Sequence, residues 1–450
     1  MNLYLCDRKK FVPLYSKKFK TMIQEIKIQN FLSFKDEATF SFEATKDSFA
    51  EEYQVVEVEK GVRLLRLAVV YGANASGKSN LLSAFDFLHS FLFKKNSDLD
   101  EPTMVTPFKL DVERPNQPSR FELVFYVGSV KYCYQLVLDS KQVYLEKLSV
   151  YHTIRPTMLF CRELENNQSV ITFNPNVVMV SQVIKEKISA ECLINMSFFA
   201  ARDKVNVSIP EIDEAKEWLK NQIMQMIGPG TRMFTYAENK IASDDKLKAY
   251  LLSVANNADF NISDISTQMI KENIPQDLLK VILGSDTISE QDKDRLRKEH
   301  SLSKPKTDFI HSVNNERGRE QYSMTSESQS RGTRRIFGLE AVLYEVFSRN
   351  GFLTIDEIET SLHPDLVEFF IASFLKQKSR SQMIVTTHYD PLLETIGDLL
   401  RKDSVWFTEK KESGHTELYS LVEFSGLNRL SSIRKAYRNG NFGALPKVKE

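Results

Sequence analysis

The sequence lacks the marks of a secreted, membrane-spanning or strongly charged protein. No apolar run approaches the roughly 18–20 residues that span a bilayer, and the basic start lacks the apolar core and cleavage site of a signal peptide. Sixty basic residues balance sixty acidic ones, so no overall field draws the chain to nucleic acid or to a membrane. The cysteines have no paired spacing, which excludes a disulfide framework or zinc site and indicates reduced thiols in the cytoplasm: Cys6, Cys133, Cys161 and Cys192.

The length and composition are those of a globular protein. The chain has 450 residues, enough for two or three compact units with a sizeable core. Residues 1–21 stand apart, because they are rich in lysine and a strand pattern begins only at Met22. We interpret them as a disordered leader; a basic arm is the alternative.

The most informative segment runs from Gly72 to Ser79 and matches the phosphate-binding pattern G-x-x-x-x-G-K-[ST]. An apolar run at 64–71 predicts a buried strand before it, and an apolar helical face at 81–92 predicts a helix after it. This context argues against an accidental glycine-rich turn. Glycines let successive N–H groups turn toward an anion, and the helix N-terminus adds its positive end. We expect a nucleotide to be bound by Gly72, Asn74, Ala75, Ser76, Gly77, Lys78, Ser79 and Asn80.

Individual residues of this loop have specific expected roles. Lys78 is expected to reach the β- and γ-phosphates, and the Ser79 hydroxyl to ligate Mg²⁺. Two later apolar strands end in polar residues that suit hydrolysis. After the strand at 352–355, Asp356 is expected to hold Mg²⁺ and Glu357 to act as general base toward water.

The second of these strands, at 382–388, ends in His388, which is expected to sense the γ-phosphate through a hydrogen bond. A strand that ends in solvated acids and a structural histidine are the plain alternatives. The presence of the phosphate loop in the same chain argues against both. A weaker signal lies at Ser330 and Gly332, which open a predicted helix as an N-cap and a point of close approach.

The pattern along the chain predicts three parts after the leader. Residues 22–175 hold the phosphate loop and many short strands, including a hairpin at 121–138. Residues 176–325 are expected to form a mostly helical insertion, too short and irregular for a long coiled coil. Residues 326–450 hold the remaining motifs.

Together these motifs resemble the ABC-type ATPases of the SMC, RecF and OLD superfamily, in particular the compact bacterial AAA family ATPases of phage-defence operons. The similarity covers nearly all of 22–450, including the opening strand Ile26–Phe34. Four motifs stand in the family's order: Walker A at Gly72–Ser79, the signature at Ser330–Thr333, Walker B and the D-loop at Ile355–Pro364, and the H-loop at Thr386–His388.

The resemblance implies an α/β P-loop NTPase fold of ABC-ATPase type, with a mixed sheet, flanking helices, an antiparallel β subdomain and the helical insertion. It implies ATP and Mg²⁺ as ligands and ATP hydrolysis as the activity. Heads of this superfamily close in pairs around ATP, so that the signature of one faces the γ-phosphate held by the other. Because the chain has one Walker A loop and one signature, we expect a homodimer or a higher oligomer built from dimers.

Departures from the superfamily narrow the expected function. The signature is not the Leu-Ser-Gly-Gly form of transporters, and the insertion stands where chromosome-organising members have long coiled coils. The sequence does not place the Q-loop glutamine; Gln117 and Gln135 are the candidates. The sequence after His388 predicts a pair of strands and then a basic segment with Arg429, Arg434, Lys435 and Arg438. It does not show the cluster of acidic metal ligands that a Toprim nuclease carries.

These features favour the ATPase component of an anti-phage defence system that controls a separate effector, such as a Toprim-type nuclease. The alternative is a RecF-like clamp that grips DNA when ATP closes it. The neutral net charge argues against that reading but leaves DNA open as a partner. A transporter nucleotide-binding domain is disfavoured by the insertion and by the signature.

Overall fold

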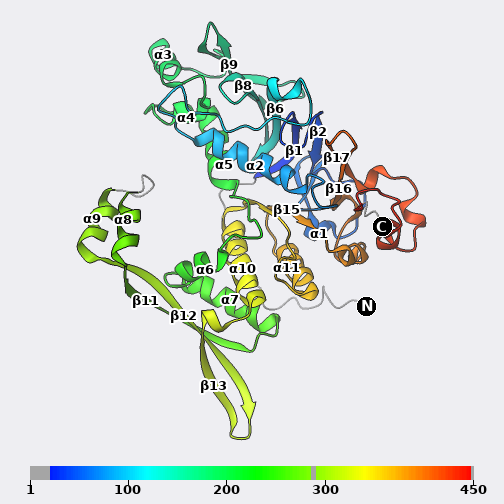
Figure 1. The fold of residues 1–450 in the computed structure, drawn as a ribbon. Coiled ribbons are helices and arrows are strands. Elements are labelled where there is room, and N and C mark those ends of the chain that lie inside the picture. Colours follow the sequence, from blue (N-terminus) through cyan, green and yellow to red (C-terminus); the bar gives the residue numbers. More distant parts are fainter. Residues whose placement is uncertain (1–20, 285–289, 447–450) are drawn as a thin grey trace. The chain divides into compact units, whose positions relative to one another are not determined.

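The computed structural model describes residues 21–284 and 290–446, which divide into two compact units (Figure 1). The first consists of the described parts of Met1–Pro229, Val346–Thr360 and Ile371–Glu450, and the second of Gly230–Glu345 and Ser361–Phe370. The leader expected at 1–21 lies outside the described residues, except for Thr21, which begins the first strand. Within the described residues, no helix combines the length and the apolar character that crossing a membrane requires.

A five-stranded sheet in the first unit carries the phosphate loop. Its spatial order is β14-β15-β5-β16-β17; the first four strands are parallel and β17 is antiparallel to β16. The central strand β5 is buried at every position, as expected where neighbouring strands and helices cover both faces. The strands are β5 (Leu67–Gly72), β14 (Phe352–Ile355), β15 (Gln382–Thr387), β16 (Val405–Lys410) and β17 (Thr416–Ser420).

A seven-stranded sheet forms the antiparallel β subdomain that the sequence predicts. Its order is β10-β9-β8-β7-β6-β1-β2, and every neighbouring pair is antiparallel. The strands are β1 (Thr21–Gln29), β2 (Ala38–Ser41), β6 (Ser119–Val127), β7 (Val130–Leu138), β8 (Val143–Tyr151), β9 (Thr157–Glu165) and β10 (Gln168–Phe173). A separate pair consists of β3 (Val55–Glu59) and β4 (Val62–Leu65).

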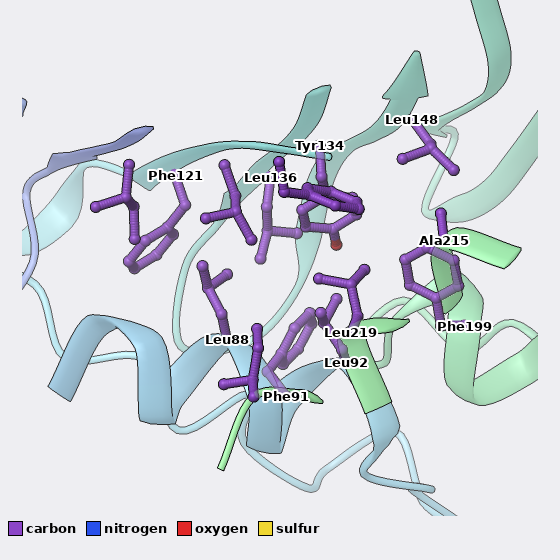
Figure 2. Packing of buried hydrophobic residues seen from close by; sticks show 14 of the residues in the cluster. Leu88, Phe91, Leu92, Phe121, Tyr134, Leu136, Leu148, Phe199, Ala215 and Leu219 are labelled. Atoms are coloured by element: carbon purple, nitrogen blue, oxygen red, sulfur yellow. The ribbon is translucent and has the colours of Figure 1, made fainter. Parts of the chain in front are cut away.

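Helix α2 (Lys78–Phe93) follows the phosphate loop and contacts both sheets. These contacts fix the position of its first turn beside the loop. The Phe85 ring lies 4.7 Å from that of Phe352 in β14, and the Phe87 ring lies 5.2 Å from that of Phe121 in β6. Figure 2 shows Leu88 and Leu92 of α2 on the side of the helix that faces the β6–β7 part of the seven-stranded sheet. Each such fully buried side chain contributes about 1.5–3 kcal/mol to stability.

The remaining helices of the first unit are short. They are α1 (Glu51–Gln54), α3 (Gln182–Glu191), α4 (Phe198–Arg202), α5 (Pro210–Gln222), α12 (Ile433–Arg438) and the C-terminal part of α11 (Pro364–Lys376). Single 3₁₀ turns are η1 (Arg114–Asn116), η3 (Asp390–Thr395), η4 (Lys402–Ser404), η5 (Leu421–Glu423) and η6 (Leu427–Arg429).

The apolar run at 64–71 is two strands rather than the single strand predicted, because Arg66 interrupts it. The Arg66 guanidinium is buried and donates hydrogen bonds to backbone carbonyls of three other segments, including that of Tyr53 at 2.8 Å. Burial lowers the pKa of Arg66 to about 9. The side chain therefore ties the start of β5 to its surroundings instead of continuing β4.

Within the segment expected to be mostly helical, apolar residues at helical spacing continue from Pro210 to Met226, but helix α5 ends at Gln222. The next residues instead run parallel to β14, with bridges from Ile223 to Phe352 and from Ile227 to Ile355. Backbone hydrogen bonds that β14 offers at its free edge compensate for the lost helical turns.

The second unit combines helices with a three-stranded antiparallel sheet, β11-β12-β13. In Figure 1, α8 and α9 lie at one end of the β11–β12 ribbon, and the β12–β13 hairpin extends from the other. Its elements are α6 (Met233–Ile241), α7 (Asp245–Asn257), β11 (Ile262–Asn273), α8 (Gln276–Leu283), α9 (Glu290–Glu299), β12 (Ser301–Asn315), β13 (Gly318–Thr325), η2 (Ser326–Ser328) and most of α10 (Arg331–Arg349).

The unit boundaries differ from the three-part division expected from the sequence. Residues 176–229 belong to the first unit, whereas 326–345 belong with the preceding segment in the second. The β11–β13 sheet lies within residues 176–325, which the sequence predicted to be mostly helical. Its outer strand β13 is largely exposed and alternates little, so it has no clear apolar pattern to reveal its length.

Candidate nucleotide-binding site

The phosphate loop connects β5 to α2 through a sharply turned backbone. Gly77 has a φ of 107° and immediately precedes α2. A Cβ at this position would lie 2.2 Å from Thr416 Oγ1 and 2.8 Å from Ser33 Oγ, so the position requires glycine for space as well as for conformation. In the described part of the chain no side chain caps the start of α2, which leaves its first N–H groups directed at the loop.

Residues that are distant in the sequence hold the phosphate loop in place through hydrogen bonds. The Thr416 hydroxyl donates to the carbonyl oxygen of Ser76 at 2.7 Å and lies 2.7 Å from the Ser33 hydroxyl. Asn80 Nδ2 in turn donates to Ser33 Oγ at 2.6 Å, and the hydroxyls of Ser76 and Thr408 are 2.6 Å apart. These contacts fix the loop against β16, β17 and the segment between β1 and β2.

Lys78 lies within the curve of the loop. Its Nζ donates to the carbonyl oxygens of Gly72 and Ala73, at 2.9 Å and 3.1 Å, and its side chain is mostly buried. Burial lowers the pKa of Lys78, while the charges of Asp356, Glu359 and Glu357 oppose that shift. The ammonium therefore faces three carboxylates without a direct ion pair to any of them among the described residues.

The carboxylates after β14 are ordered by Thr386. Its hydroxyl donates to Asp356 Oδ1 at 2.6 Å and accepts from the Glu357 N–H at 2.9 Å. Asp356 is buried, with 8% of its surface exposed, and its N–H donates to the carbonyl of Ile227 at 2.8 Å. Glu357 has a φ of 48°, an unusual conformation for this residue type that turns its side chain away from the strand direction.

His388 follows β15, the neighbour of β14. Its backbone N–H donates to Glu359 Oε1 at 2.6 Å, and its side chain is exposed. Although the residue is exposed, partial desolvation of the imidazole lowers the pKa of His388, and the charge of Lys78 lowers it further; the carboxylates of Glu359, Glu357 and Asp356 act in the opposite direction.

A cavity of about 580 Å³ brings together most of the residues predicted for the site. Every lining residue belongs to the first unit. The predicted residues in the lining are Asn74, Ala75, Ser76, Gly77, Lys78, Ser79, Asn80, Glu357 and His388. Gly72 lines an adjoining cavity of about 900 Å³, which shares Asn74, His388 and Lys410 with the first.

The rest of the lining of the 580 Å³ cavity comes from segments that sequence reasoning did not assign to the site. They are Leu32 and Ser33, the run from Thr106 to Leu110, Lys410 and Gly414. Their separation along the chain leaves no local motif that would reveal them. The Q-loop candidates are not part of the lining: Gln135 Nε2 donates to Glu122 Oε2 at 2.7 Å, and Gln117 accepts from Asn30 through its backbone carbonyl.

Ser330 and Gly332, the predicted signature residues, belong to the second unit. Ser330 Oγ accepts a hydrogen bond from the Thr333 N–H at 3.0 Å and so caps the start of α10, as the sequence predicts. A Cβ on Gly332 would lie 3.1 Å from the carbonyl oxygen of Ser361, so glycine allows this helix start to approach the D-loop closely. Ser330 is exposed.

Solved structures that are similar to this chain include SMC heads. The SMC head domain from Thermotoga maritima is 12% identical, with a TM-score of 0.37, and the match covers 88% of this chain and 98% of that chain. An SmcHead bound to the C-winged helix domain of ScpA is 14% identical, with a TM-score of 0.39, and the match covers 92% and 99%. At these TM-scores the likeness alone supports no conclusion about this chain.

No curated protein matches the chain significantly. A protein-family model, however, matches the amino-acid sequence itself. The profile of the family described as "AAA domain, putative AbiEii toxin, Type IV TA system" matches residues 67–178 and 240–394, which together make up more than half of the chain. The matched residues include the phosphate loop, the carboxylates after β14 and the H-loop, on the P-loop ATPase fold described above. The chain belongs to this family of AAA-domain proteins.

Proposed function

We propose that this protein binds ATP with Mg²⁺ in the 580 Å³ cavity, hydrolyses it, and pairs with a second copy of itself around the nucleotide. The observation that carries the proposal is the convergence of three separate segments on that cavity: the phosphate loop at Asn74–Asn80, Glu357 after β14, and His388 after β15. Phosphate binding, activation of water and sensing of the γ-phosphate each need a group of one of these kinds.

The chemistry of the donor set fits a nucleotide bound together with Mg²⁺. The uncapped start of α2 and the Lys78 ammonium suit phosphate oxygens. Among the described residues there is no cluster of three or more histidine, cysteine or acidic side chains that could hold a metal by itself. Mg²⁺ commonly takes one or two protein ligands and completes its shell with phosphates and water, a role that Ser79 and Asp356 fit. When bound, the ion would neutralise charge on the phosphates.

In the proposed mechanism the protein's side chains position the phosphates of ATP and polarise the attacking water. Lys78 holds the β- and γ-phosphates, and Glu357 accepts the proton of the attacking water as general base. The Thr386 hydroxyl supports this role, because it fixes both the Asp356 carboxylate and the Glu357 backbone. His388 donates a hydrogen bond to the γ-phosphate as a neutral imidazole, in keeping with its lowered pKa.

The pairing of two copies follows from the division of motifs. Each chain supplies one phosphate loop and one exposed signature at Ser330, which caps a helix whose N-terminal end suits an anion. A site completed across a two-fold axis would use both motifs twice. Nucleotide would then act as a switch for assembly as well as a substrate.

The role that we propose for this switch is cytoplasmic anti-phage defence, in which the ATPase controls a separate effector such as a Toprim-type nuclease. The family description, which names a putative toxin of a type IV TA system, is compatible with a role in restraining infected or stressed cells. A DNA clamp is less well supported, because two of the basic residues in the C-terminal segment are engaged by acids: Arg434 and Arg438 both pair with Asp390.

The test is phosphate release from Mg²⁺·ATP by the purified chain, with and without a chelator, beside nucleotide binding measured by a fluorescent analogue. We expect Mg²⁺-dependent release by the wild type. Absence of both binding and release would contradict the ATPase proposal. For the defence role, deletion of the gene with its neighbours should raise phage sensitivity; salt-sensitive DNA binding that needs ATP would favour the clamp instead.

A further inference from the structure

The carboxylate of Glu359 holds the turn that carries His388. Its Oε1 accepts the backbone N–H of His388 at 2.6 Å, and its Oε2 accepts the Thr387 hydroxyl at 2.8 Å. The Thr387 oxygen also accepts the N–H of Tyr389 at 2.9 Å. One side chain therefore organises the three successive residues Thr387, His388 and Tyr389, although it contacts only the first two directly.

The need for such a side chain follows from the way the two strands end. Strands β14 and β15 pair in parallel as far as Ile355 and Val385. Beyond them, Glu357 turns the chain away, and the backbone bond from Ile358 to Thr386 is the last between the two segments. In the part of the chain that the structure describes, no strand then pairs with the His388 N–H on this side, and Glu359 provides a charge-assisted acceptor in its place.

The hydrogen bonds of Glu359 distinguish it more than its charge does. Asp356, Glu357 and Glu359 all act on the pKa values of Lys78 and His388 in the same direction, so the negative charge is shared among three groups. By contrast, among the described residues Glu359 alone accepts hydrogen bonds from both the Thr387 hydroxyl and the His388 backbone N–H. Glu359, like Asp356, does not line the 580 Å³ cavity, and both of its carboxylate oxygens accept hydrogen bonds from the segment that carries His388.

We propose that Glu359 is a positioning residue, which fixes the His388 turn to the segment after Walker B so that His388 and Glu357 address the same phosphate. The proposal rests on the function proposed above. A displacement of a reacting group by about 1 Å costs on the order of 10²-fold in rate. Loss of the Glu359 bonds should therefore appear mainly in kcat, with little change in nucleotide affinity.

Two variants and one control separate positioning from charge. E359A removes both acceptors, whereas E359Q keeps an acceptor for the His388 N–H and can donate to the Thr387 oxygen, without the charge. We expect kcat of E359A to fall by roughly 10- to 100-fold and that of E359Q to stay within about threefold of wild type. Glu165, an exposed carboxylate of β9, serves as the control in E165A, which should leave kcat unchanged.

A double variant tests whether Glu359 acts through His388. In an H388A background the further change E359A should alter kcat by less than about twofold, because the group being positioned is gone. Multiplicative effects of the two substitutions would overturn the proposal. Equal losses in E359Q and E359A would also overturn it, since the charge would then be responsible.

Amide hydrogen exchange supplies a measurement that does not depend on hydrolysis. The peptide covering residues 387–389 should exchange faster in E359A than in the wild type, and E359Q should resemble the wild type. If the wild type releases no phosphate from ATP, the proposed function fails, while this exchange result still reports on the contact. Faster exchange in E359A with unchanged kcat in an active enzyme would overturn the positioning role.

Discussion

The ammonium of Lys78 donates a hydrogen bond to the carbonyl oxygen of Gly72, 2.9 Å away, and a second to that of Ala73. The backbone of the loop thus holds the Lys78 ammonium, the group that we propose binds phosphate. Burial lowers the pKa of Lys78 at this position. The negative charges of Asp356, Glu359 and Glu357 act in the opposite direction and raise the pKa of Lys78. The loop and these carboxylates together therefore place a positively charged group where it can bind phosphate oxygens.

Replacement of Lys78 by alanine should weaken nucleotide binding by roughly 10- to 100-fold, the range expected for the loss of charge-assisted hydrogen bonds. Titration with a fluorescent ATP analogue measures the effect. Lys60→Ala, at an exposed lysine in the turn between β3 and β4, is the matched control and should bind as the wild type does. Equal affinities in K78A and wild type would show that the nucleotide is held elsewhere.

Replacement of Glu357 by glutamine should separate binding from hydrolysis. Glutamine keeps the size of the side chain but cannot accept a proton from water, so kcat should fall by about 10²–10⁴-fold while the affinity for ATP is retained. Phosphate release and the fluorescent titration give the two quantities on the same sample.

The same variant should accumulate the paired form. If ATP closes two copies and hydrolysis releases them, E357Q should elute as a dimer in the presence of Mg²⁺·ATP and not with ADP, as light scattering would show. Turnover by E357Q at the wild-type rate would mean that another group acts as the base.

Contiguous motifs made much of the site predictable from the sequence. The residues from Asn74 to Asn80 carry their own geometry, because a strand, a glycine turn and a helix follow one another in the chain. Glu357 and His388 could be placed beside them for a related reason: each follows an apolar strand, and parallel strands end at the same edge of a sheet.

The parts that sequence reasoning missed depend on contacts between distant segments. Thr416 meets Ser33 across 383 residues, and neither lies in a motif that marks it. Arg66 stood within an apolar run, and only its buried contacts explain why β4 and β5 separate there. Tertiary hydrogen bonds of this kind override local propensity without leaving a periodic signal.

The bracing of the phosphate loop predicts how Gly77 responds to substitution. Gly77→Ala combines a left-handed backbone with a Cβ only 2.2 Å from Thr416 Oγ1. Gly61→Ala is the matched control, because Gly61 also has a positive φ, of 83°, but nothing lies within 4 Å of its Cβ position. The control should cost about 1–2 kcal/mol of unfolding free energy.

Gly77→Ala should cost more than the control and also abolish nucleotide binding, because Thr416, Ser33 or the loop must move. Chemical denaturation and the fluorescent titration distinguish these effects. Thr416→Val removes the hydroxyl that holds Ser76 and should cost about 1 kcal/mol. If G77A and G61A lose the same stability and both bind nucleotide, the contacts with Thr416 do not constrain the loop.

A mixture of two inactive variants tests whether the site is shared between copies. Ser330→Asp retains an N-cap for α10, since aspartate caps as well as serine, but brings a negative charge to the place where the γ-phosphate of the partner would lie.

In a dimer of K78A with S330D, the S330D chain keeps Lys78 and the K78A chain keeps Ser330. These two residues meet in one of the two sites, which is therefore intact. Random pairing makes half of the dimers mixed, and we expect about a quarter of the wild-type turnover from independent sites. Each variant alone should be nearly inactive, and Ser330→Thr, which keeps the hydroxyl, should be active. A mixture no more active than its components would mean that each chain hydrolyses ATP without its partner's signature.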